Sequence, residues 1–219
     1  MLPIVSIVGA SDSGKTTFLE KLIPELTARG YRVGAVKHDA HGFEIDREGK
    51  DTWRLKRAGA VVTAISSKDQ FASIRQTDEE MSLEEIAARF FWTEDILITE
   101  GFKRERFPKI EIFRSTREPK PICGQGDNLI AIVSDDAVDT QVPKFSFAEW
   151  RGVADFIENR YLKGKKKRKI LVQLDGKQMP MNDFVEDFVV GAIKGMLSSL
   201  RGYGKPRIIS IHVRLGEDD

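Results

Sequence analysis

The stretch IVSIVGASDSGKTT, which runs from Ile4 to Thr17, decides the fold of this chain. Its apolar beginning predicts a short strand that is buried on both faces. The strand ends at Gly9, and the segment from Gly9 to Thr16 matches the phosphate-loop pattern G-x-x-x-x-G-K-[ST] at every fixed position. A helical pattern follows, which is the context that the motif requires. The stretch therefore predicts a binding site for a nucleoside triphosphate.

Each fixed position of the loop has a physical task. The glycines let the backbone wrap closely, so that successive N–H groups point into one concavity and bind phosphate oxygens. Lys15 brings a positive charge to the β- and γ-phosphates, and the Thr16 hydroxyl is placed to ligate Mg²⁺. The following helix presents its positive N-terminal end to the same anion. The residues predicted to bind the phosphates are Gly9, Ser11, Asp12, Ser13, Gly14, Lys15, Thr16 and Thr17.

Composition and charge are those of an ordinary globular protein. Of the 219 residues, 41% are hydrophobic and 32% are charged, and the formal net charge is +1. This balance argues against bulk electrostatic capture of nucleic acid or of a membrane surface. The single cysteine, Cys123, excludes an internal disulfide and has no visible partner that would activate it as a nucleophile.

No apolar stretch reaches the ~18 residues of a membrane span, and the first apolar run leads directly into the phosphate loop. We therefore expect a soluble cytoplasmic protein without a signal peptide.

Strands and helices alternate after the phosphate loop. Ser82 with Glu85, and Ser146 with Glu149, have the spacing of capping boxes that open helices. Pro24 is expected to bend the first helix or to end its regular part early. Helices are expected over residues 18–30, 51–59, 82–91 and 146–161, and strands over residues 32–37, 60–65, 68–75, 95–101, 109–114 and 129–133. This order predicts an α/β fold, a mostly parallel sheet with helices on both faces, as in P-loop NTPases.

The last part of the chain reads as a separate, small α+β module. We place a nucleotide-binding domain at residues 1–162, a basic linker at residues 163–169, and the module at residues 170–219. The basic run is interpreted as a solvated linker, with nucleic-acid binding as the alternative. The module is expected to contain a strand at 170–174, a helix capped by Asn182 and a strand at 208–213. Because about fifty residues bury little core alone, it should lean on the main domain or on a second copy.

An acidic residue at the end of a strand is expected to face the Mg²⁺ in a phosphate-loop protein. The strand at 95–101 offers Glu100 at its carboxyl end and Asp95 at its amino end. Parallel strands put their carboxyl ends on the ligand side of the sheet, so we choose Glu100. Glu100 and Lys15 are the predicted catalytic residues, and Glu100 and Thr16 are predicted metal ligands.

The segment after the second strand carries His38, Asp39, His41, Asp46 and Asp51. Its spacing matches no standard zinc pattern. A nucleotide switch that faces the γ-phosphate, where an Asp such as Asp46 holds Mg²⁺ directly or through water, is the favoured interpretation. A transition-metal site and a plain surface loop are the alternatives.

Three blocks beyond the phosphate loop carry a family resemblance. They are VKHDAHGFEIDREGKDTWRLKRAGA from Val36 to Ala60, ITEGFKRERFPKIEIFR from Ile98 to Arg114, and LIAIVSDD from Leu129. With GASDSGKTT they resemble the molybdopterin-guanine dinucleotide biosynthesis protein B (MobB) family over roughly residues 1–160. The resemblance implies a GTP-binding, weakly hydrolysing, dimeric protein. It implies an adaptor role, with the guanylyltransferase that joins GMP to molybdopterin, or another molybdenum-cofactor protein, as the partner. The region after about Lys163 lies outside the common pattern.

The resemblance also implies roles for individual positions. Residues 9–17 would hold the phosphates of GTP, and Glu100-Gly101-Phe102-Lys103 would form the acidic motif at a strand end. Asp46, Lys50 and Asp51 would belong to the second block of the family pattern. Ser134 and Asp135 would lie where the base is read.

Three functions remain open from the sequence. The first is a GTPase-like adaptor that binds a cofactor-processing partner, and the second is a small-molecule kinase or ligase that uses the same loop. The absence of an obvious arginine-rich lid segment favours the adaptor. The third is a scaffold that keeps the nucleotide for structural reasons only.

Overall fold

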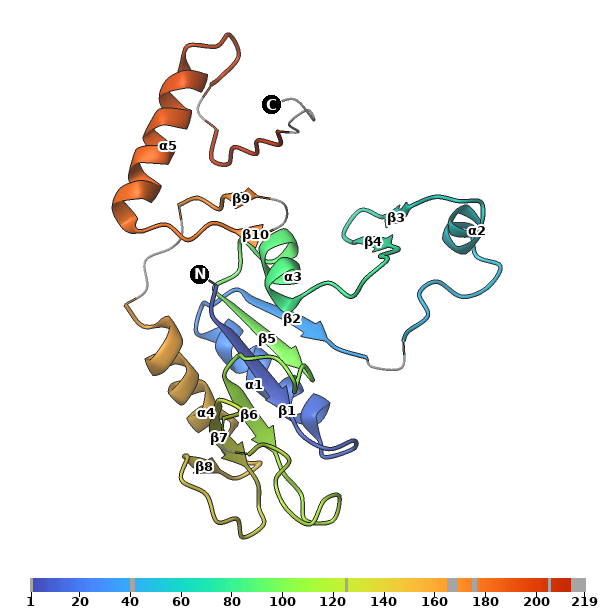
Figure 1. Cartoon of the computed structure of the whole chain (residues 1–219), viewed down its shortest axis with the longest axis vertical. Helices are drawn as coiled ribbons and strands as arrows, with labels where there is room; N and C mark the ends of the chain where they lie inside the picture. Colours follow the sequence, from blue (N-terminus) through green and yellow to red (C-terminus); the bar gives the residue numbers. More distant parts are fainter. Residues whose placement is uncertain are drawn as a thin grey trace.

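The computed structural model describes residues 2–39, 42–124, 126–164, 169–174, 177–204 and 206–213. Its centre is a six-stranded sheet in the order β2-β5-β1-β6-β7-β8, and all neighbouring strands run parallel (Figure 1). The strands are β1 (Ile4–Val8), β2 (Val33–Lys37), β5 (Ile96–Glu100), β6 (Lys109–Ile112), β7 (Leu129–Val133) and β8 (Lys144–Phe145). The predicted α/β class and the mostly parallel sheet are confirmed.

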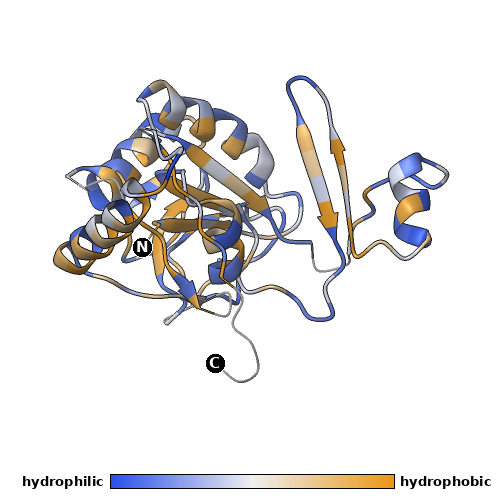
Figure 2. Cartoon of the chain, turned by 90° about the horizontal axis from the view of Figure 1, so that it is seen from above, coloured by the Kyte–Doolittle hydropathy of each residue, from blue (hydrophilic) through white to orange (hydrophobic). Residues whose placement is uncertain are grey.

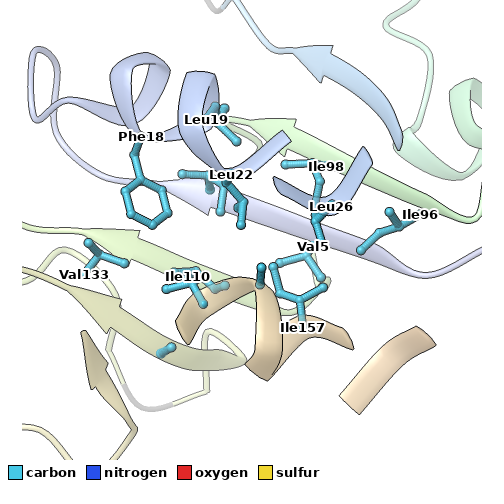
Figure 3. Close-up of a cluster of buried hydrophobic side chains, with 14 of the residues drawn as sticks. Val5, Phe18, Leu19, Leu22, Leu26, Ile96, Ile98, Ile110, Val133 and Ile157 are labelled. Atoms are coloured by element: carbon cyan, nitrogen blue, oxygen red, sulfur yellow. The ribbon is translucent and has the colours of Figure 1, made fainter. Parts of the chain in front are cut away.

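Helices cover both faces of this sheet, because strand side chains alternate between the faces. Val5 and Ile98 point to the face covered by α1 (Lys15–Ala28) and α4 (Trp150–Ile157). Figure 3 shows the side chains of Phe18, Leu22 and Leu26 from α1 in this layer. Ile4 and Leu97 belong to the second cluster, with α3 (Leu83–Phe90). Both clusters position β1 and β5, whose carboxyl ends flank the phosphate loop.

The observed starts of α3 and α4 can be compared with the two predicted capping boxes. The Ser82 hydroxyl accepts a hydrogen bond from the Glu85 N–H, and Glu85 accepts one from the Ser82 N–H, so this capping box is confirmed. The second box is only half formed. The Ser146 N–H donates to Glu149 Oε2 over 2.7 Å, but Glu149 itself is the N-cap of α4. The helix therefore begins later than predicted, and a π-helical turn, η1 (Glu158–Leu162), continues it.

Pro24 does not end α1, which continues to Ala28. Leu22 and Leu26 on either side of it are fully buried, and this burial offsets the loss of one backbone hydrogen bond.

Residues 43–79 form an arm that projects away from the sheet in both views (Figures 1 and 2). The arm contains α2 (Asp51–Arg57) and an antiparallel hairpin of β3 (Val62–Ser66) and β4 (Phe71–Arg75). These elements lie close to their expected positions in the sequence. Among the described residues, β3 and β4 pair only with each other and take no part in the main sheet.

The C-terminal region begins with a two-stranded sheet of β9 (Gln173–Leu174) and β10 (Lys177–Gln178). Helix α5 (Asp183–Ser198) follows, and Asn182 caps it by accepting a hydrogen bond from the Val185 N–H, as predicted. No residue of α5 is buried. The strand predicted at 208–213 is wrong, because these residues have no regular structure and no paired strand within the described part of the chain. Most of the basic run, residues 165–168, lies outside the described residues.

Among the described residues, no helix is both long and apolar enough to span a bilayer.

Candidate nucleotide-binding site

The phosphate loop connects β1 to α1 through two glycines that no other residue could replace without strain. Gly9 has φ 147°, and an added Cβ would lie 2.4 Å from the Ile112 carbonyl oxygen. Gly14, directly before α1, has φ 96°. L-residues rarely adopt such angles, whereas glycine does so readily. The two glycines therefore hold the loop in its wrapped form.

The loop contains polar groups that have no hydrogen-bond partner among the described residues. The Ser13 hydroxyl is buried and has no hydrogen-bond partner within the described structure. The first N–H groups of α1 have no partner inside the helix. The Lys15 ammonium donates to the carbonyl oxygens of Ala10 (2.6 Å) and Gly9 (3.2 Å) and so lies across the loop. This arrangement fits an anion with several oxygens.

Three lysines gather at this edge of the sheet. Burial is the main cause that lowers the pKa of Lys15. Lys37 and Lys103 act in the same direction, whereas the charges of Glu100 and Asp12 oppose the shift. Lys37, which ends β2 and is the register partner of Glu100, was missed in the sequence analysis. Its place at the carboxyl end of a parallel strand was the signal that could have identified it.

The structure brings together the two principal predicted metal ligands. The Thr16 hydroxyl at the start of α1 donates to Glu100 Oε2 at the end of β5, over 2.7 Å. Asp95, the alternative, lies before the amino end of β5, where its carboxylate accepts the Arg32 N–H. A hydroxyl and a carboxylate are hard oxygen ligands, which suit Mg²⁺. The pair therefore fits a divalent cation such as Mg²⁺ at this edge of the sheet.

The structure does not bring Asp46 to this pair. Asp46 lies in the arm, where its carboxylate accepts hydrogen bonds from the Thr52 hydroxyl and the Arg47 N–H. These bonds, led by that from Thr52, lower the pKa of Asp46. His38 remains near the site, with Nε2 2.8 Å from a Glu80 oxygen. Within the described ranges, no three His, Cys, Asp or Glu side chains are arranged to hold a metal ion, and His41 lies outside those ranges.

The residues expected near the base lie after β7. Ser134 is buried, and its hydroxyl accepts the Asp136 N–H. Asp135 Oδ1 accepts the N–H of Phe147 over 3.0 Å and so joins the loop after β7 to the loop after β8. Asp136 instead accepts the Ser115 N–H, which lowers the pKa of its carboxyl group.

A second residue missed in the sequence analysis contacts the loop directly. Arg114 follows β6, and its Nε donates to the Ser13 carbonyl oxygen over 3.0 Å. Its guanidinium carbon lies 4.0 Å from the ring centre of Phe147. Arg114 ends the predicted strand KIEIFR, so its place at the carboxyl end of a parallel strand pointed to it as well.

Cys123 is not part of this site. Burial and the charge of Glu111 raise the pKa of its thiol to about 12. Such a thiol is a poor nucleophile.

Known proteins of similar sequence and structure share this chain's fold. The family model described as "Molybdopterin guanine dinucleotide synthesis protein B" (MobB) matches residues 4–135. The "Molybdopterin-guanine dinucleotide biosynthesis adapter protein" of Haemophilus influenzae is 38% identical over 159 residues, which cover 72% of this chain and 89% of the relative. The crystal structure of Bacillus subtilis MobB has a TM-score of 0.59 and 31% identity, and covers 75% of this chain and 100% of that one.

One relative also extends over the C-terminal region. A "Putative molybdopterin-guanine dinucleotide biosynthesis adapter protein" of Methanocaldococcus jannaschii is 26% identical over 240 residues, which cover 96% of this chain and 97% of the relative. The region after residue 162 is therefore not unique to this chain.

Proposed function

Because the chain belongs to the molybdopterin guanine dinucleotide synthesis protein B (MobB) family, we propose that it is a GTP-binding adaptor protein of molybdenum cofactor biosynthesis, which assists the formation of molybdopterin guanine dinucleotide. One observation carries the proposal to this chain. The phosphate loop is complete, and its Thr16 hydroxyl already contacts the Glu100 carboxylate across the edge of the sheet. A chain that had kept only the fold would not need this pair.

The loop supports binding of the triphosphate. Its glycines hold the backbone in a conformation that other residues rarely adopt, and the Lys15 ammonium lies across it. The carboxylate of Asp135, on the same side of the sheet, would read the guanine base. GTP is therefore the proposed ligand, and its phosphates would point towards β5 and its base towards β7.

Magnesium is the proposed metal, and Thr16 and Glu100 would hold it. When bound, it would neutralise charge on the β- and γ-phosphates. Lys15 would stabilise the same charge. Hydrolysis would also require the Glu100 carboxylate, because this group would hold the metal. We propose weak GTP hydrolysis through these two residues. Asp46 would reach the metal only if the segment between β2 and α2 moved towards the loop, as in a nucleotide switch.

The arm supports a homodimer. Its hairpin carries exposed apolar side chains on both faces: Ile65 is 60% exposed and Phe71, which points to the other face, is 71% exposed. An isolated two-stranded hairpin is only marginally stable in water. We propose that a second copy of the chain covers these residues. The dimer would then present its GTP sites to the partner, a molybdopterin guanylyltransferase.

The adaptor proposal is tested by binding to a guanylyltransferase in the presence of GTP and Mg²⁺, of ATP and Mg²⁺, or of no nucleotide. We expect GTP with Mg²⁺ to strengthen the interaction most, and turnover of GTP to be slow. Binding that is the same without nucleotide would contradict a GTP-dependent adaptor. Fast transfer of the γ-phosphate to a small acceptor would support a kinase instead.

A further inference from the structure

The two sides of the phosphate loop differ in chemistry, and this difference sets the direction of a bound nucleotide. On the side of β5 and β2 lie Glu100, Lys37 and Lys103, which are groups for metal ions and terminal phosphates. Ligands of open parallel sheets lie outside the carboxyl ends of the strands. The nucleoside must therefore extend the other way, over the carboxyl ends of β6, β7 and β8.

A planar surface lies on that side, directly against the loop. The exposed Arg114 donates through Nε to the Ser13 carbonyl oxygen, which fixes the guanidinium beside the loop. The Phe147 ring backs the guanidinium at 4.0 Å, and an added Cβ on Gly14 would lie 3.4 Å from the same ring. The loop, the guanidinium and the ring thus form one contiguous unit.

Phe147 is itself held on two sides. Its ring packs edge-on against the buried Phe18 of α1, with ring centres 6.4 Å apart. Its N–H donates to Asp135, the residue expected to read the base. The position of the Arg114–Phe147 pair is therefore tied both to the start of α1 and to the loop after β7.

We propose that the Arg114 guanidinium, backed by Phe147, is the platform on which the purine base of the nucleotide stacks. This inference rests on the proposed nucleotide site. Guanidinium planes stack on aromatic rings and on bases, and such stacking does not distinguish one base from another. The platform therefore supplies affinity for any purine nucleotide, whereas Asp135 supplies the preference for guanine.

The experiment separates the base from the phosphates. Binding of GTP, ATP and inorganic tripolyphosphate is measured by calorimetry, with Mg²⁺, for the full chain and three variants. Phe147→Leu keeps an apolar side chain but removes the backing ring. Arg114→Lys keeps the charge and a donor for Ser13 but removes the plane. Phe145→Leu is the matched control, because this ring packs against Phe156 at 5.9 Å and not against Arg114.

Each platform variant should bind GTP and ATP about tenfold more weakly, with an unchanged ratio between them, and should bind tripolyphosphate as the parent chain does. Phe145→Leu should leave all three affinities unchanged. Equal losses for GTP and tripolyphosphate, or no loss for GTP, would overturn the platform while the nucleotide site stands. A parent chain that binds neither ligand would overturn both the platform and the proposed function.

Discussion

The strands of the central sheet and those of the arm have similar apolar sequences, but their side chains differ in burial. In the central sheet, Val5 and Ile98 are at most 1% exposed, because helices cover both faces. In the arm, Ile65 and Phe71 are 60% and 71% exposed (Figure 2, where both hairpin strands carry hydrophobic segments). A local apolar pattern therefore specifies a strand, but it does not determine which helix or other surface covers the strand. The central sheet is stabilised by its own buried side chains, whereas the apolar side chains of the arm remain exposed.

The largest expected effect is a difference in stability between matched substitutions. Leu22→Ala removes a fully buried side chain from α1, so it should cost about 2–5 kcal/mol of unfolding free energy. Ile65→Ala in the arm should cost less than about 1 kcal/mol in a sample diluted until light scattering shows a monomer. Urea unfolding of both variants and of the parent chain measures the two changes in the free energy of unfolding. Similar costs would mean that the arm folds as a part of the core.

A smaller effect is expected at the contact between α1 and α4. Arg29 donates hydrogen bonds to Asp155 (2.6 Å) and Glu158 (2.7 Å), and its side chain is only 19% exposed. Arg29→Ala should therefore destabilise the domain by about 1.5–3 kcal/mol. Arg54→Ala in the arm, where the side chain is 72% exposed, is the matched control and should cost almost nothing. Equal losses would refute the distinction between domain and arm.

The same contact should make stability depend on pH. Hydrogen bonds from Arg29 and Tyr31 hold the pKa of Glu158 below its ordinary value of 4.5. The ionised group thus stabilises the native state above pH 4.5, and this contribution is lost as the pH falls through the lower folded pKa. In Arg29→Ala, unfolding measured between pH 5 and 2 should depend less on pH. An unchanged slope would show that Arg29 does not set the pKa of Glu158.

Substitutions in the arm, and not elsewhere, should change whether the chain is a dimer or a monomer. Ile65→Ser with Phe71→Ser should shift the chain from dimer to monomer in light scattering and leave GTP binding unchanged, because both residues are outside the phosphate loop. Phe184→Ser in α5, where the side chain is 77% exposed, is the control. If only this control dissociates the dimer, the C-terminal region and not the arm is the interface.

Much of the domain follows from local signals in the sequence. The phosphate loop, the Ser82 cap and the buried strands each depend on residues close together in the chain. The proposed base platform does not, because Ser13, Arg114 and Phe147 follow β1, β6 and β8 and meet only when the four strands β1, β6, β7 and β8 lie side by side. Likewise, the alternation at residues 208–213 favours a strand, but a strand also needs a neighbour, which the described chain does not supply. Local sequence patterns thus predicted the helices and strands, whereas contacts between distant residues determined which strands pair and which side chains meet.

The central claim is that residues 9–17 bind the phosphates of GTP. Lys15→Ala removes the charge that lies across the loop, and Lys21→Ala removes an equal charge from the exposed face of α1, near Trp150. Calorimetric titration with GTP and Mg²⁺ should show at least about a tenfold loss of affinity for Lys15→Ala and no loss for Lys21→Ala. The thermal stability of both nucleotide-free variants should match that of the parent chain. Unchanged GTP affinity in Lys15→Ala, or an equal loss in Lys21→Ala, would contradict the assignment of the loop.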